Sequence, residues 1–317
     1  MVSDSSIKCP FLLTVFTAAT PCLQTQRTTA SETSSNIFLL QKSNTLSPDT
    51  EDDSFRDLIE HLSPPEKMAG LCWMAVVLAF SLSAGNTEAM NQNRLETIVK
   101  YIMEMYSVCN KGNTLQFSLA VNIPENQYLN LQELFKDDVA DNVKRLLKKG
   151  KVYTSNNMVA AMPMKKKDEH AEARVLANIQ PLPDSSAGKS LVFYSYLSPC
   201  VTKCANPKHD DNILKDINEK IPKDKWAERV FVFSTIFKKY TDQNGKEQEF
   251  SENEIRDALK ELGGTTLDYN IFRCDYSYNA QASDHSGPFQ CIKCFSNGAP
   301  EPVDEHCVQK EFKQKKN

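Results

Sequence analysis

The stretch "DEHAEARVLANIQPLPDSSAGKSLVFYSYLSPCVTKCAN" (residues 168–206) decides both the fold and the chemistry that we expect of this chain. It places four chemically reactive side chains within one short segment: His170, Glu172, Cys200 and Cys204. Histidine and cysteine are common metal ligands, and a glutamate beside them can move protons. The stretch therefore raises the question of a metal site that does chemistry.

The local pattern predicts a helix followed by a buried strand. We expect Asp168 to cap a helix that runs to about Ile179, because the prolines just beyond it break a helix. The apolar run "LVFYSYL" (residues 191–197) predicts a buried strand that ends before Pro199. We expect the two cysteines to begin the next helix. Two helix N-termini would then meet at the carboxyl end of that strand, where their dipoles favour thiolates.

The same alternation of helix and strand continues on both sides of this stretch. Helical spacing or capping signals predict helices at 94–106, 131–149, 208–221 and 251–264. Alternating or continuous apolar runs predict strands at 115–123, 157–164, 191–197, 229–237 and 265–274. Strands that alternate with helices predict a sheet covered on both faces, here a three-layer α/β/α sandwich of five strands.

The donor set fits a catalytic zinc ion. Zinc is held by imidazole nitrogen and thiolate sulfur, and a catalytic zinc keeps a fourth position for water beside three protein ligands. His170, Cys200 and Cys204 supply three such ligands. Glu172 lies about 200° around the helix from His170, so it is free to exchange protons with the water rather than bind the metal.

His170-Ala171-Glu172 followed by Pro199-Cys200-Val201-Thr202-Lys203-Cys204 resembles the H-x-E and P-C-x(2–4)-C signature of the zinc-dependent cytidine deaminase superfamily, in particular its AID/APOBEC-like branch. The resemblance implies a cytidine deaminase-like fold with a five-stranded mixed sheet. It also implies Zn²⁺ on His170, Cys200 and Cys204, with Glu172 as the catalytic proton shuttle. The substrate class implied is a cytosine-type or related base, presented as a nucleoside, a nucleotide or single-stranded nucleic acid.

The chain departs from that branch in three places. Polynucleotide deaminases typically carry tryptophan immediately before Ser-Pro-Cys, but this chain has Leu197 there, with Tyr196 before it. A helix at about 131–149 is inserted between the first two strands, and the cysteine-containing tail from 276 to 317 is expected to lie outside the fold. Because Leu197 replaces that tryptophan, this chain lacks the aromatic side chain that the resemblance implies for base stacking.

The N-terminal third differs from the rest in composition. Residues 1–67 are rich in Ser, Thr and acidic side chains, which predicts a disordered leader or an extension of the gene model. The apolar run that follows Met68 is too short to span a membrane but suits a signal peptide at 68–85. A start at Met68 predicts a secreted protein with a deaminase-like domain at 88–275. A start at Met1 instead predicts a cytoplasmic protein in which the same run is a buried helix.

Charge and cysteine content constrain the partners and the compartment. The 37 basic and 41 acidic side chains leave a net charge near −4, so no global field draws the chain to a polyanion. Without a membrane span, we expect no stable membrane insertion. If Cys200 and Cys204 hold a metal, five cysteines beyond the signal peptide allow two disulfides and one free thiol: Cys109, Cys274, Cys291, Cys294 and Cys307.

Five alternatives remain open at this point. Cys200 and Cys204 could form a disulfide, or their zinc could be purely structural. Cys291-x-x-Cys294 could hold a second, structural zinc, although disulfides suit a secreted chain better. The basic run 165–167 could meet a phosphate or be a solvated surface. The chain could also be a secreted binding or immune-interaction protein that keeps the fold without turnover.

Overall fold

The computed structural model describes residues 7–8, 90–126, 130–241, 245–278, 287–296 and 302–314. All of them belong to one of two compact units of the chain, the unit that comprises residues 1–15 and 87–317. The expected leader and signal peptide lie outside the described residues, except for the short strand β1 (Ile7–Lys8).

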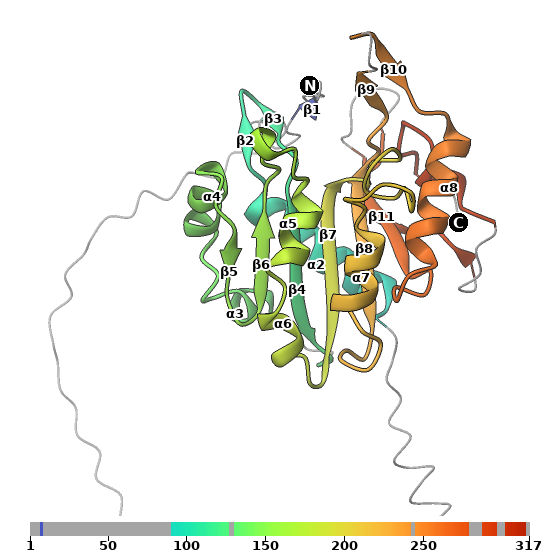
Figure 1. Cartoon of the computed structure of the whole chain (residues 1–317). Helices are drawn as coiled ribbons and strands as arrows, with labels where there is room; N and C mark the ends of the chain where they lie inside the picture. Colours follow the sequence, from blue (N-terminus) through green and yellow to red (C-terminus); the bar gives the residue numbers. More distant parts are fainter. Residues whose placement is uncertain are drawn as a thin grey trace, which may run out of the picture. The chain divides into compact units, whose positions relative to one another are not determined.

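The centre of the described unit is one mixed sheet of seven strands (Figure 1). Its spatial order is β12 (Phe289–Lys293), β11 (Ile271–Tyr276), β8 (Arg229–Thr235), β7 (Lys189–Leu197), β4 (Ser118–Pro124), β6 (Met158–Ala161) and β5 (Tyr153–Thr154). β7, β8 and β11 run parallel, and the other neighbours pair antiparallel. The mixed α/β class is confirmed, but the sheet has two more strands than the five expected.

The two additional strands lie at the two edges of the sheet. β5 has two residues, which is too short to give a periodic signal. β12 comes from the cysteine-containing tail and pairs antiparallel with β11, with Cys274 opposite Cys291. The expectation that the tail lies outside the fold is therefore wrong, because its backbone extends the sheet.

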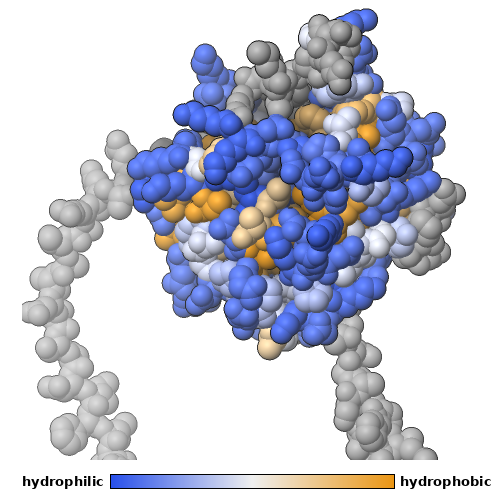
Figure 2. All heavy atoms as spheres, viewed as in Figure 1, coloured by the Kyte–Doolittle hydropathy of each residue, from blue (hydrophilic) through white to orange (hydrophobic). Residues whose placement is uncertain are grey.

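Helices cover both faces of the sheet. One face carries α2 (Gln92–Tyr106), α3 (Leu131–Leu134) and α4 (Ala140–Lys148). The other carries α5 (Ala171–Ala177), α6 (Pro181–Asp184), α7 (Leu214–Lys220) and α8 (Glu252–Gly263), which lie in front of the sheet in Figure 1. This is the expected three-layer α/β/α arrangement, and the space-filling view of the same side is mostly hydrophilic, with hydrophobic patches between the polar groups (Figure 2).

Strand β7 shows why a continuous apolar run forms the middle of such a sheet. Leu191 and Phe193 face the core under α5 and α7, whereas Val192 and Tyr194 face the core under α2. Successive side chains point to opposite faces of a strand, so a strand buried on both faces needs apolar residues at nearly every position. Ser195 breaks this rule, and it faces the same side as Phe193.

The inserted segment 131–149 is not one helix. α3 ends at Leu134 and α4 begins at Ala140, and the turn between them holds the buried Asp138. The Asp138 carboxylate accepts a hydrogen bond of 2.8 Å from the hydroxyl of Tyr153, and its carbonyl accepts one of 2.8 Å from the hydroxyl of Tyr106. These tertiary contacts fix the turn against the local preference for a continuous helix.

Short elements complete the described unit. β2 (Cys109–Asn110) and β3 (Asn113–Thr114) form a hairpin, and β3 also pairs with β1. Gly112 closes the hairpin with φ of 80°, a conformation that favours glycine. β9 (Lys239–Thr241) pairs with β10 (Glu247–Glu249), and two 3₁₀ turns lie at Lys165–Lys167 and Glu305–Cys307.

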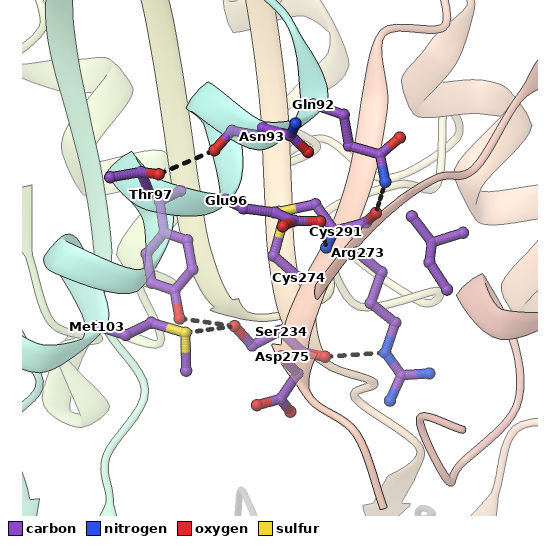
Figure 3. The surroundings of a disulfide bond; sticks show 12 residues. Gln92, Asn93, Glu96, Thr97, Met103, Ser234, Arg273, Cys274, Asp275 and Cys291 are labelled. Carbon is purple, nitrogen blue, oxygen red and sulfur yellow. Dashed lines mark hydrogen bonds between the residues drawn. A yellow bond between two sulfur atoms is a disulfide. The ribbon is translucent and has the colours of Figure 1, made fainter. Parts of the chain in front are cut away.

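Disulfides hold the tail to the sheet. Cys274 is bonded to Cys291 and Cys294 to Cys307, so the Cys291-x-x-Cys294 pair forms two disulfides rather than a second zinc site. Figure 3 shows the first bond beside α2, where Gln92 donates to the carbonyl of Cys291 and Glu96 accepts from its N–H. Cys109 is disulfide-bonded as well, so it is not the free thiol that was allowed for.

The buried Arg273 also anchors the tail. Its guanidinium donates to the carbonyls of Ser234, His306, Gln309 and Lys310 and lies 4.8 Å from the ring centroid of Phe312. Buried charges are tolerated only when hydrogen bonds satisfy them, as here.

Candidate metal centre and proton shuttle

His170 is the residue that caps α5. Its backbone is extended (φ −75°, ψ 156°) and the helix begins at Ala171. Asp168, which was expected to cap this helix, instead has a left-handed backbone with φ of 53°. The extended cap turns the imidazole of His170 away from the helix and toward the loop that follows β7.

Cys200 lies directly before the turn residues 201–205 that follow β7, Cys204 lies within them, and neither is in a helix. The expectation that they begin a helix is wrong, because the next helix, α7, starts at Leu214. The turn is closed by a hydrogen bond of 3.0 Å from the N–H of Ala205 to the carbonyl of Cys200. The N–H of Cys204 points at Sγ of Cys200 over 3.2 Å, so a backbone dipole stabilises a thiolate there without a helix.

The structure brings His170, Cys200 and Cys204 together. Nδ1 of His170 lies 2.9 Å from Sγ of Cys204 and 3.6 Å from Sγ of Cys200, and one ligand atom from each residue lies within 4.8 Å of the others. Ligand atoms around a tetrahedral zinc are about 3.5–3.8 Å apart, given Zn–S and Zn–N distances of about 2.3 and 2.0–2.1 Å. The donor set therefore suits zinc, and the 3.6 Å distance matches this spacing, whereas His170 and Cys204 would move apart to hold the ion.

Both cysteines are free thiols, which removes the alternative of a disulfide between them. A hydrogen bond from Cys204 and the neighbouring His170 lower the pKa of Cys200 to about 4, against the effect of burial. The same hydrogen bond and burial raise the pKa of Cys204. Burial lowers the pKa of His170, but contact with Cys200 outweighs it and the pKa is raised. The two opposite shifts favour the thiolate at Cys200, beside the imidazole of His170, over the thiolate at Cys204.

Glu172 lies in the first turn of α5, and only 3% of its surface is exposed. Burial raises the pKa of its carboxyl, although the neighbouring His170 and a hydrogen bond from Ser195 oppose the change. The Ser195 hydroxyl donates to Oε1 of Glu172 over 2.8 Å, and the side-chain amide of Gln116 donates to the same oxygen over 3.2 Å. A buried carboxyl with a raised pKa beside a candidate metal centre is suited to acid–base chemistry.

The topology explains why these residues meet. β4 runs antiparallel to β7, with Ser118 opposite Ser195, so the start of β4 lies at the carboxyl end of β7. Both serines face the side on which α5 packs. Gln116, Ser118 and Ser195 were not among the site residues expected from the sequence. The available signal was two serines inside otherwise apolar strands.

Lys203 was also not identified as a site residue. It lies between the two cysteines, and only 14% of its side chain is exposed. Its Nζ is 3.0 Å from a carboxylate oxygen of Asp168 and 3.1 Å from one of Asp211. Lys203 therefore ties the loop that carries His170 to the loop that carries both cysteines.

Neither Leu197, which stands where polynucleotide deaminases carry tryptophan, nor Tyr196 before it places an aromatic ring at the site. Tyr196 is buried in the core under α2, on the face opposite α5, and Leu197 is half-buried. The basic run forms a 3₁₀ turn in which Lys166 and Lys167 are exposed.

A comparison with protein-family models matches residues 92–311, more than half of the chain, to the family described as Secreted Novel AID/APOBEC-like Deaminase 1. The chain belongs to this family. The matched region contains the whole candidate metal centre and extends through the tail that completes the sheet. No curated protein and no solved structure matched the chain in the other two comparisons.

Membership of the Secreted Novel AID/APOBEC-like Deaminase 1 family makes this a deaminase-like protein of the AID/APOBEC-like group. That group is typically zinc-binding, and the chain has a His/Cys/Cys group that could hold the metal. The family description says secreted, and disulfides persist in oxidising compartments. No helix among the described residues has the length and apolar character needed to cross a bilayer.

Proposed function

We propose that the protein is a secreted, zinc-dependent hydrolytic deaminase that acts on a cytosine-type or related base. The observation that carries this proposal is the convergence of two free thiols, a histidine and a buried glutamate at one end of the sheet. The other cysteines in the described part of the chain are disulfide-bonded, so the two free thiols are set apart from them.

His170, Cys200 and Cys204 would hold the metal, each through one atom. When bound, zinc supplies an activated water as the nucleophile for hydrolysis, and three protein ligands leave the position that this chemistry needs. A site that served only to stabilise the fold would be closed by a fourth protein ligand. Among the described residues, these three form the group with metal-ligand geometry.

Glu172 would exchange protons during the reaction. Its carboxylate would take a proton from the attacking water and pass it to the ring nitrogen next to the reacting carbon. It would then transfer the proton of the newly added hydroxyl to the amine, so that the carbon–nitrogen bond breaks, ammonia leaves and the carbonyl forms. The raised pKa suits this role, since a carboxyl whose pKa lies closer to the working pH both accepts and releases protons.

The base could be part of a nucleoside, a nucleotide or single-stranded nucleic acid. Because Leu197 is not aromatic, we do not expect a base to stack on this position as it does on the tryptophan of polynucleotide deaminases. For localisation, we propose that translation starts at Met68 and that residues 68–85 are removed as a signal peptide. The family description and the disulfides support this.

A second candidate function is a secreted binding or immune-interaction protein that keeps the fold without turnover. The tail favours it, because two disulfides and Arg273 attach an additional disulfide-linked segment to the sheet. The buried, hydrogen-bonded Glu172 favours the enzyme, because binding alone does not need it.

The test uses zinc-loaded full chain with three probes: cytidine, cytidine monophosphate, and single-stranded DNA or RNA with a single cytosine. Release of ammonia with formation of the uracil product, lost in Glu172→Gln, supports the deaminase. If zinc is bound but no probe releases ammonia above the level of Glu172→Gln, the binding protein is favoured.

A further inference from the structure

The hydrogen bonds next to Glu172 are all donated in the direction of its carboxylate. Ser195 and Gln116 both donate to Oε1, and Ser118 and Gln116 in turn donate to Oγ of Ser195 over 3.0 and 2.9 Å. A serine hydroxyl has one proton to give. Because two donors already point at the Ser195 oxygen, its own proton is directed at Glu172.

The orientation of Gln116 is fixed as well. The backbone N–H of Leu197 meets the side-chain carbonyl of Gln116 over 2.8 Å. An N–H only donates, so this contact identifies the oxygen of the Gln116 amide and turns its NH₂ group toward Glu172 and Ser195. Leu197 is three residues before Cys200, so the strand end that leads to the metal loop also sets this donor.

We propose that Ser195 and Gln116 are positioning residues that hold the Glu172 carboxylate in one orientation for the reaction. The inference rests on the proposed function. Both side-chain donors contact Oε1, so two hydrogen bonds to one oxygen fix the orientation of the carboxylate. A glutamate side chain has three rotatable bonds, and a displacement of about 1 Å of a reacting group can cost about 100-fold in rate.

The kinetic test compares Ser195→Ala, Ser195→Thr and the control Ser190→Ala in zinc-loaded full chain, with the probe that the wild-type protein deaminates best. Ser190 is a buried serine near the other end of the same strand. We expect kcat to fall about 10- to 100-fold in Ser195→Ala with KM within about twofold. Ser195→Thr keeps the hydroxyl and should recover most of kcat, and Ser190→Ala should retain it.

A kcat of Ser195→Ala within twofold of wild type would overturn the inference. So would a change confined to KM, or an equal loss in Ser190→Ala, because either outcome indicates binding or general folding rather than positioning.

A thermodynamic cycle separates this inference from the proposed function. Ser195→Ala should lower the folding equilibrium constant about tenfold more in the wild-type background than in Glu172→Ala, where the acceptor is missing. The contacts that Ser118 and Gln116 make to Ser195 are lost in both backgrounds and cancel in this comparison. If no probe is deaminated, the proposed function fails, and the cycle still decides whether Ser195 holds Glu172. Equal effects in both backgrounds would contradict the contact and with it the inference.

Discussion

Nδ1 of His170 lies 2.9 Å from Sγ of Cys204, although 34 positions of sequence separate the two residues. The first residue caps a helix that packs on β4 and β6, and the second lies in a turn that follows β7. The candidate metal centre is therefore assembled by the sheet, and the loops around it must be held together by contacts outside the ligands.

Lys203 supplies one such contact, and its removal should weaken metal binding. In Lys203→Met the ion pairs to Asp168 and Asp211 are lost, so the two ligand-bearing loops are no longer tied. Loss of a contact that supports metal ligands typically costs 10- to 100-fold in affinity, and we expect about tenfold weaker zinc binding. Competition with a chromogenic chelator measures it.

Lys208→Met is the matched control, because it removes an exposed lysine from the same loop region. It should bind zinc like the wild type. Equal zinc affinity in Lys203→Met and wild type would show that the ion pairs do not support the site.

Asp138 should make stability depend on pH. Burial raises the pKa of its carboxyl, against hydrogen bonds from Ser155 and Tyr153 that lower it. The unfolded chain, with an Asp pKa of about 3.9, therefore loses this proton at lower pH than the folded chain does. The stabilising contribution of the protonated group is complete below about pH 4 and is lost as the pH rises through the folded value.

Asparagine has a shape similar to aspartate and cannot ionise, so Asp138→Asn should not lose this stabilising contribution as the pH rises. The free energy of unfolding of the wild type, minus that of Asp138→Asn, should decrease as the pH rises from about 3.5 to about 7. Urea unfolding of both proteins across that range measures it. A difference that stays constant or increases with pH would show that the folded pKa of Asp138 is not raised.

The bond between Cys274 and Cys291 should contribute strongly to stability and little to metal binding. It closes a loop of sequence separation 17, for which chain entropy predicts about 3 kcal/mol. The double variant Cys274→Ser with Cys291→Ser should lose about that much free energy of unfolding in urea. Its zinc content should match the wild type, and loss of zinc in the folded variant would show that the tail supports the site.

Elements with a strong local signal could be predicted from the sequence. The capping box of Ser251 and Glu254 marks the start of α8, and the apolar run of β7 marks a strand buried on both faces. Elements that depend on tertiary contacts could not be predicted from the sequence. The break before α4 depends on Asp138 meeting Tyr106 and Tyr153, and β12 becomes a strand only by pairing with β11.

The candidate site divides in the same way. His170, Glu172, Cys200 and Cys204 could be proposed from their spacing, because metal chemistry restricts the residue types. The cysteine turn could not be told from a helix start, since apolar periodicity gives no signal between Pro199 and Ile213. Gln116 and Ser195 are 79 positions apart, and only the register of β4 against β7 brings them to Glu172.

The most direct test of the account is the zinc content of freshly purified wild-type protein, Glu172→Ala and Cys200→Ala, measured by elemental analysis. We predict about one equivalent of zinc in the wild type and in Glu172→Ala, and almost none in Cys200→Ala, because of these two residues only Cys200 is proposed as a ligand. Wild-type protein without zinc, with Cys200 and Cys204 joined in a disulfide, would contradict the metal centre and the deaminase mechanism built on it.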